Sequence, residues 1–185
     1  MMFERFTPEA RDVVKQSVAV SERAGADVVT EEHLLLALME QEGTRAAFAF
    51  TALGITDRRE SVRSALSEAH RRAGISRSEV EALAGLGVDV DEIVARAEES
   101  HGQGVLRTGA RTGRRRFLAR TFTRAAQDTL VRSLRIATGR GDRRIGGEHF
   151  LLALTARQGV VSEVLADHGA TYASVERVIY GAAPA

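Results

Sequence analysis

Apolar residues recur every three or four positions along most of the chain, a spacing that predicts amphipathic helices. Thr7 is suited to cap the first of these helices, Pro8 to occupy its first position, and Gly25 to form its C-terminal turn. Residues 34–39 are apolar almost all round, so they predict a central, buried helix that begins at Thr30 or Glu31. The apolar stripe of the first helix comprises Ala10, Val13, Val14, Ser17, Val20 and Ala24.

The same pattern occurs a second time. When residues 6–43 are set on residues 122–159 without gaps, 13 of the 38 positions are identical, including two Glu-His pairs and two Leu-Leu-Ala-Leu runs. The second copy predicts a helix capped by Thr123 and a buried helix from about Gly147 to Ala156. One such repeat has little surface with which to close a core, so we expect an all-α fold in which two repeats stack on each other. The leucines expected in this core are Leu35, Leu38, Leu151 and Leu154.

Each repeat is predicted to contain two further helices. A short third helix follows Thr44 in the first copy and spans about 160–168 in the second. The fourth helix is predicted at about 89–100 after Asp89, and at 171–180 after Thr171. Each copy is therefore expected to be a pseudo-symmetric four-helix repeat.

The material between the copies divides into two parts. Residues 57–87 are predicted to be an inserted helical segment, with a charged helix over 57–73 and a shorter helix after Ser76, which has capping-box spacing to Glu79. Residues 102–116 are rich in Gly and Arg and lack apolar periodicity, which predicts a flexible linker. The expected division is a first repeat over 1–101, the linker, and a second repeat over 117–185.

Composition narrows the class of protein. The formal net charge of the 185 residues is +1, so no overall field attracts nucleic acid, and Lys15 is the only lysine. The absence of cysteine excludes disulfides, thiol catalysis and cysteine-based zinc sites. No secretory signal and no apolar run of 18 residues is visible, so we expect a cytoplasmic protein with no membrane segment.

No motif for catalysis, metal or cofactor binding accompanies the repeats. The pairs Glu32-His33 and Glu148-His149 lack the second histidine, four residues away, that helical zinc sites need, and there is neither a phosphate-binding loop nor a serine-nucleophile motif. The sequence therefore predicts no enzyme activity, no metal and no cofactor. The repeated glutamate has two interpretations: a contact with its own helix N-terminus above a packed histidine, or a ligand-binding role.

Two other groups of residues have both a structural and a functional interpretation. Residues 100–127 hold seven arginines and no acid, which is typical of a solvated linker but also suits contacts with phosphates, with Phe117 and Phe122 available for stacking. No nucleic-acid-reading motif accompanies them. Among the phenylalanines, Phe6 is expected in the core, while Phe3 and Phe122 either pack there too or line an apolar groove between the repeats.

The doubled pattern resembles the N-terminal domain of ClpC- and ClpA-type unfoldases. The resemblance rests on the opening Met-Met-Phe-Glu-Arg-Phe-Thr, on the Glu-His-Leu-Leu-Leu-Ala-Leu of the first central helix, and on its Glu-His-Phe-Leu-Leu-Ala-Leu counterpart. It implies two pseudo-twofold four-helix repeats that receive substrates and adaptors for Clp proteolysis. In ClpC relatives the glutamate of each Glu-His pair, here Glu32 and Glu148, binds phosphorylated arginine, and cyclic peptides occupy an apolar surface where Phe3 and Phe122 match.

The departures from the family pattern shape the functional prediction. The chain ends at Ala185, where the family's nucleotide-binding modules would begin, so we expect a stand-alone, non-catalytic module without unfoldase activity. Such a module would act as an adaptor or decoy for Clp components, their substrates, phosphoarginine degrons or cyclic peptides. The alternative function is a small nucleic-acid-binding or regulatory protein that uses the arginine-rich linker.

The family's Gly-Thr-Glu-His differs between the two repeats. Gly146 and Gly147 precede Glu148 and are expected to offer bare amides to a phosphate, whereas Glu31 adds a negative charge beside Glu32. The sequence therefore predicts that the second repeat is the better phosphoarginine site and that Glu31→Thr strengthens the first.

Overall fold

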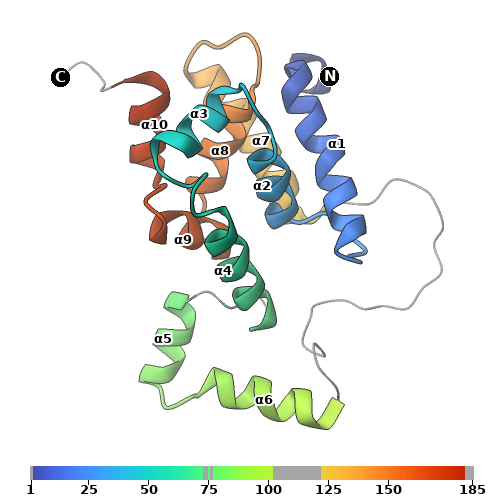
Figure 1. Ribbon diagram of the computed structural model, residues 1–185, viewed down its shortest axis with the longest axis vertical. Coiled ribbons are helices and arrows are strands. Elements are labelled where there is room, and N and C mark those ends of the chain that lie inside the picture. The colour runs from blue at the N-terminus through green and yellow to red at the C-terminus, as the bar shows by residue number, and fades with distance from the viewer. Residues whose placement is uncertain (1, 73–74, 76, 102–121, 182–185) are drawn as a thin grey trace.

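The computed structural model describes residues 2–72, 75, 77–101 and 122–181, and every regular element within them is a helix (Figure 1). The predicted all-α class is confirmed. The arginine-rich linker at 102–116 and Phe117 lie outside the described residues. A short 3-10 helix, η1 (Met2–Arg5), opens the chain.

The first three helices of the two repeats correspond one to one. They are α1 (Pro8–Arg23), α2 (Glu31–Met39) and α3 (Arg45–Ala52) in the first repeat, and α7 (Arg124–Gly139), α8 (Gly147–Thr155) and α9 (Val160–Asp167) in the second.

The capping predictions for the opening helices are confirmed. The Thr7 hydroxyl accepts a hydrogen bond from the Ala10 amide at 3.2 Å, and Thr123 accepts one from Ala126 at the same distance. After α1, Gly25 adopts φ +65°, a backbone conformation that favours glycine because it has no Cβ.

The core lies around the central helices α2 and α8, which contact each other and are flanked by α1 and α7 (Figure 1). The four leucines predicted to be buried are at most 1% exposed. Phe6, from the first repeat, packs edge-on against Phe150 of α8 with ring centroids 5.4 Å apart. The two repeats thus share one apolar core, which is continuous through both central helices.

Backbone contacts across the repeat boundary also come in matched pairs. The Thr7 amide donates to the Ile145 carbonyl at 3.0 Å, and the Thr123 amide donates to the Val29 carbonyl at 2.9 Å. Each bond joins the entry to one repeat with the segment that precedes the central helix of the other. This exchange is what a pseudo-twofold arrangement requires.

The fourth helices are exchanged in the same way. In the first repeat α4 (Arg59–Arg71) packs on α9 of the second, and α10 (Tyr172–Tyr180) packs on α3 of the first. Val62 of α4 and Val175 of α10 are both fully buried. This packing corrects the prediction that assigned the fourth helix to residues 89–100 and an insertion to 57–87, because the apolar side of α4 covers α9.

The additional material is instead α5 (Arg77–Gly85) and α6 (Val90–His101), which lie beyond α4 at one end of the molecule (Figure 1). Among the side chains described, neither helix contributes to the continuous core. Polar contacts attach them: Ser78 donates to Glu163 of α9 at 2.7 Å, and Arg72 donates to Asp91 at 3.0 Å. None of the described helices combines the length and the apolarity needed to cross a bilayer.

Candidate ligand-binding site

The Glu-His pairs lie in the first turns of α2 and α8, and in both the histidine is structural. His33 is 7% exposed and its Nδ1 accepts a hydrogen bond from the Thr30 amide at 2.9 Å. His149 is 1% exposed and accepts one from the Gly146 amide at 3.0 Å. Each ring therefore satisfies a backbone N–H that would otherwise be unpaired at the helix start.

Glu148 is held close to the backbone that precedes it. Its side chain is 14% exposed, and its carboxylate lies 3.7 Å from His149 Nδ1. A Cβ added at Gly146 would overlap the Glu148 carboxylate, and one at Gly147 would come within 3.0 Å of Leu38 Cδ1. The Glu148 carboxylate therefore lies directly over Gly146, and Gly147 packs against Leu38 of the first repeat.

This packing changes the predicted role of the two glycines. The Gly146 amide already donates to His149, so it is not bare, and both glycines are buried. The Glu148 carboxylate, in contrast, remains partly exposed. A cationic side chain lies nearby: the guanidinium of Arg45 in α3, which is mostly exposed, is 4.0 Å from the Glu148 carboxylate.

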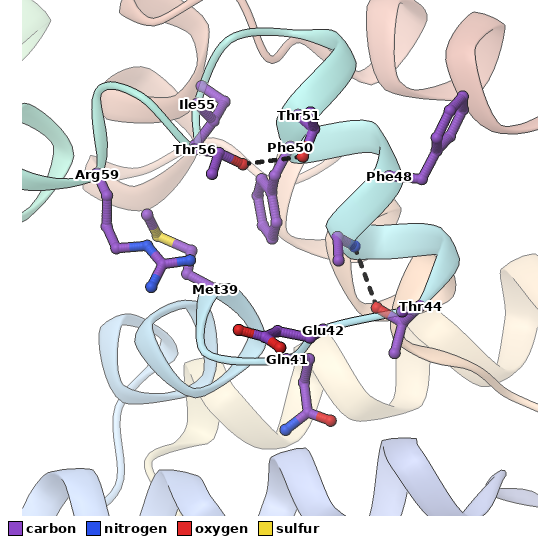
Figure 2. Close-up of a pocket in the computed structure, with 12 residues that line it drawn as sticks. Met39, Gln41, Glu42, Thr44, Phe48, Phe50, Thr51, Ile55, Thr56 and Arg59 are labelled. Carbon is purple, nitrogen blue, oxygen red and sulfur yellow. Dashed lines mark hydrogen bonds between the residues drawn. The ribbon is translucent and has the colours of Figure 1, made fainter.

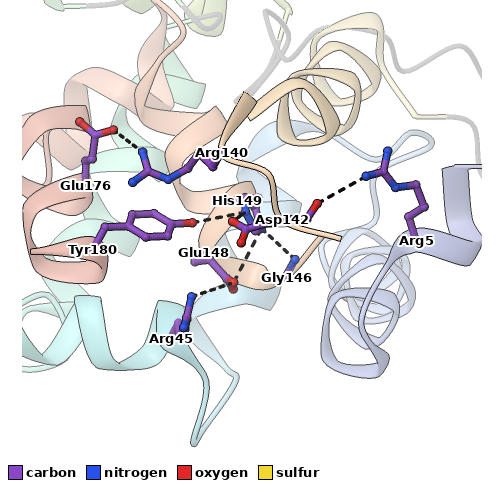
Figure 3. A network of polar contacts seen from close by, with 9 residues as sticks. All are labelled: Arg5, Arg45, Arg140, Asp142, Gly146, Glu148, His149, Glu176 and Tyr180. Atoms are coloured by element: carbon purple, nitrogen blue, oxygen red, sulfur yellow. Dashed lines mark hydrogen bonds and ion pairs between the residues drawn. The ribbon is translucent and has the colours of Figure 1, made fainter. Parts of the chain in front are cut away.

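A polar network surrounds this carboxylate (Figure 3). Because Nδ1 of His149 is an acceptor, its proton is on Nε2, which donates to Asp142 at 3.0 Å. The Tyr180 hydroxyl lies 3.3 Å from the same nitrogen, and Arg140 lies over the Tyr180 ring, 3.6 Å from its centroid. Burial, with the negative charges of Asp142 and Glu148, raises the pKa of Tyr180 to about 12.

The first repeat surrounds its glutamate differently. Burial, together with the negative charge of Glu31, raises the pKa of Glu32 from 4.5 to about 7. Glu31 is itself ion-paired with Arg157 of the second repeat at 2.9 Å and accepts a hydrogen bond from Thr129 at 3.1 Å. The Nδ1 atom of His70 in α4 lies 3.8 Å from the Glu32 carboxylate, a contact that is an ion pair only when the histidine is protonated.

The apolar groove predicted at Phe3 and Phe122 stays a prediction. Phe122 is half-buried and forms a backbone bridge with Val29. Phe3 falls within η1, but its side chain lies outside the described part of the structure.

Several residues near the glutamates were not predicted from the sequence. Arg45 of α3 and Tyr180 of α10 reach Glu148 and His149 from distant parts of the sequence. Asp142 lies in the loop before α8, seven residues before His149, where no motif marks it as a partner. Within the described residues, no cluster of three or more histidines and acids is arranged to hold a metal ion.

The sequence matches the family described as the Clp repeat N-terminal domain over residues 5–105 and 121–184. The chain belongs to this family. Its domains are generally non-catalytic protein-binding modules for Clp chaperones and proteases.

Two solved structures share the fold of this Clp repeat protein. The N-terminal domain of the Clp-associated chaperone ClpD from Arabidopsis thaliana superposes with a TM-score of 0.52 at 16% identity, over 97% of this chain and 94% of that one. A structure described as part of a malarial protein secretion system superposes with a TM-score of 0.55 at 11% identity, over 95% and 92%. At these identities the likeness concerns the fold alone.

Proposed function

We propose that this protein is a non-catalytic adaptor or decoy in Clp proteolysis that holds phosphoarginine-bearing segments at Glu148. The observation that carries the proposal is the pairing of a partly buried carboxylate with the Arg45 guanidinium, 4.0 Å away. The carboxylate suits the guanidinium of the ligand, and Arg45 suits its phosphate. Clp components or their substrates would then be the partners.

The protonation of Glu32 supports a preference for the second repeat. With a pKa of about 7, Glu32 is neutral in roughly half of the molecules at neutral pH, and a neutral carboxyl attracts a guanidinium weakly. The negative charge of Glu31 contributes to this raised pKa. Glu31→Thr should therefore improve the first site, even though Arg157 neutralises part of the Glu31 charge.

The assignment of the ligand to Glu148 can be tested by calorimetric titration of free phosphoarginine. We expect Glu148→Gln to weaken binding at least about tenfold, because a charge-assisted, bidentate contact is lost. Glu32→Gln should change the affinity by less than about threefold near pH 7. Glu9→Gln is the matched control, since Glu9 is an exposed acid in the first turn of α1. Loss of binding in Glu32→Gln but not in Glu148→Gln would place the ligand in the other repeat.

Arg45 gives a second and independent test. If its guanidinium contacts the ligand phosphate, Arg45→Gln should weaken phosphoarginine binding about five- to tenfold. The same change should not weaken the binding of free arginine, which has no phosphate. An equal loss for both ligands would mean that Arg45 only orients Glu148.

A further inference from the structure

Each repeat has a cavity at the same place, between the end of its central helix and its third helix. In the first repeat the cavity is bordered by α2 and α3, and in the second by α8 and α9. The second repeat is one residue shorter just before its third helix than the alignment of residues 6–43 implies. Thr44 precedes α3 and Gly159 precedes α9, so equivalent positions in these two helices are 115 residues apart. By this correspondence Phe48 is equivalent to Glu163.

The cavity of the second repeat is partly covered by helix α5 of the same chain. Ser78 and Glu79, in the first turn of α5, form part of its lining. The Ser78 hydroxyl donates to Glu163 at 2.7 Å, and the Arg77 guanidinium lies 3.8 Å from Asp167 of α9. This position in the fold therefore accepts the first turn of a helix through polar contacts.

The equivalent cavity in the first repeat has an apolar floor and a largely polar rim (Figure 2). It measures about 480 Å³ and is lined entirely by residues between 39 and 59. Its floor is formed by Met39, Phe50 and Ile55, which are at most 3% exposed, while Phe48 at its rim is 61% exposed. No described helix covers this cavity in the way that α5 partly covers the cavity of the second repeat.

Two charged residues complete the rim of this cavity. Figure 2 shows Arg59 and Phe48 on opposite sides of Phe50, with the Glu42 carboxylate below. Within the described part of the chain, neither Glu42 nor Arg59 forms an ion pair. An apolar floor with an acid and a base at its edge suits an amphipathic helix that carries one large apolar side chain and flanking charges of both signs.

We propose that the first-repeat cavity binds the first turn of an amphipathic helix from a partner protein. The helix resembles α5 but carries an apolar residue where α5 has Ser78, because Phe48 replaces the Glu163 that accepts the Ser78 hydrogen bond. A basic residue of the partner faces Glu42, and an acidic one faces Arg59. Glu148 is not among the residues that line this cavity, although Arg45 lies one helical turn before Phe48.

The test uses two peptides and the full chain. Each peptide spans residues 75–88 with blocked ends; one has the native sequence and the other carries Ser78→Leu. In nitrogen-15 NMR titrations of the full chain, the Ser78→Leu peptide is expected to shift the amide signals of Phe48, Phe50 and Thr56. It should bind the first-repeat cavity at least about tenfold more tightly than the native peptide, since an apolar anchor in a pocket dominates such contacts.

The variant Phe48→Glu gives the first cavity the acid of the second. It should weaken binding of the Ser78→Leu peptide at least about tenfold while leaving the native peptide no weaker. Val131→Glu, at an exposed apolar position of α7, is the control and should change neither affinity. Thermal unfolding shows whether each variant is folded.

The outcomes are decisive in both directions. If the Ser78→Leu peptide does not bind at millimolar concentration, or binds wild type and Phe48→Glu equally, the proposal is overturned. The competing possibility is that a second copy of this chain fills the cavity, and sedimentation of the protein without peptide tests it. A dimer that Phe48→Glu dissociates would show that a second copy of this chain fills the cavity, and would also overturn the partner-protein proposal.

Discussion

Phe150→Ala is expected to lower the free energy of unfolding by about 3–5 kcal/mol, because it removes a large side chain that both repeats enclose. Phe150 is 1% exposed, lies in the central helix α8, and packs edge-on against Phe6 of the other repeat. The cavity left behind would be bounded by both repeats, so relaxation of one repeat alone cannot fill it. Urea unfolding followed by circular dichroism measures the loss.

The matched control for this prediction is Phe48→Ala. Phe48 has the same side chain, but it is 61% exposed, so its removal should change the free energy of unfolding by less than about 1 kcal/mol. The comparison separates burial from residue type. Similar losses in the two variants would contradict the shared core described for the repeats.

Glu32→Gln is expected to stabilise the protein above neutral pH and to have much less effect in acid. The pKa of Glu32 rises from 4.5 to about 7 on folding, chiefly because the carboxyl is buried. Between these values the folded state holds a proton that the unfolded state has released. The contribution of this group to stability is therefore complete below pH 4.5 and is lost as the pH rises through about 7.

The size of the effect follows from the same shift. A shift of about 2.5 pKa units corresponds to about 3 kcal/mol, which is an upper bound because the Glu32 side chain retains some contact with water. The measurement is the difference in unfolding free energy between wild type and Glu32→Gln at about pH 5 and pH 8, which cancels the titration of groups common to both.

His70 provides the control, since its Nδ1 lies 3.8 Å from Glu32. In a His70→Gln background the gain from Glu32→Gln at high pH should persist. Its disappearance there would identify the histidine, and not the carboxyl, as the source of the pH dependence.

Local sequence patterns were sufficient for the helices whose signals lie within a few residues. Thr7 and Thr123 cap the helices they were predicted to cap, and the apolar runs before Met39 and Thr155 form the buried central helices. Here the pattern and the structure have the same cause, because an all-apolar segment can only be stable in the interior.

The fourth helix of the first repeat was misplaced because its partner is distant in sequence. Arg58, at the start of α4, forms no side-chain cap, whereas Asp89 caps α6 by accepting from the Glu92 amide at 3.0 Å. The capping signal therefore favoured the wrong helix. What places α4 is the burial of Val62 and Leu66 on α9, a contact that no local pattern contains.

The candidate site also depends on contacts that local sequence patterns do not reveal. The Glu-His pairs were visible in the sequence, but the return of the His149 ring to the Gly146 amide was not. That contact removes one of the two donors expected for a phosphate. The cation that stands near the site, Arg45, belongs to the other repeat and becomes visible only when the repeats are stacked.

The exchange of the fourth helices has a thermodynamic consequence. Since α4 covers α9 and α10 covers α3, each repeat completes the other, and separating them would expose buried surface on both. The two repeats should therefore unfold in a single transition, with one midpoint for probes placed in either half. A ligand bound at Glu148 alone would then protect those amides of α1 and α2 that exchange through global unfolding as strongly as the corresponding amides of α8.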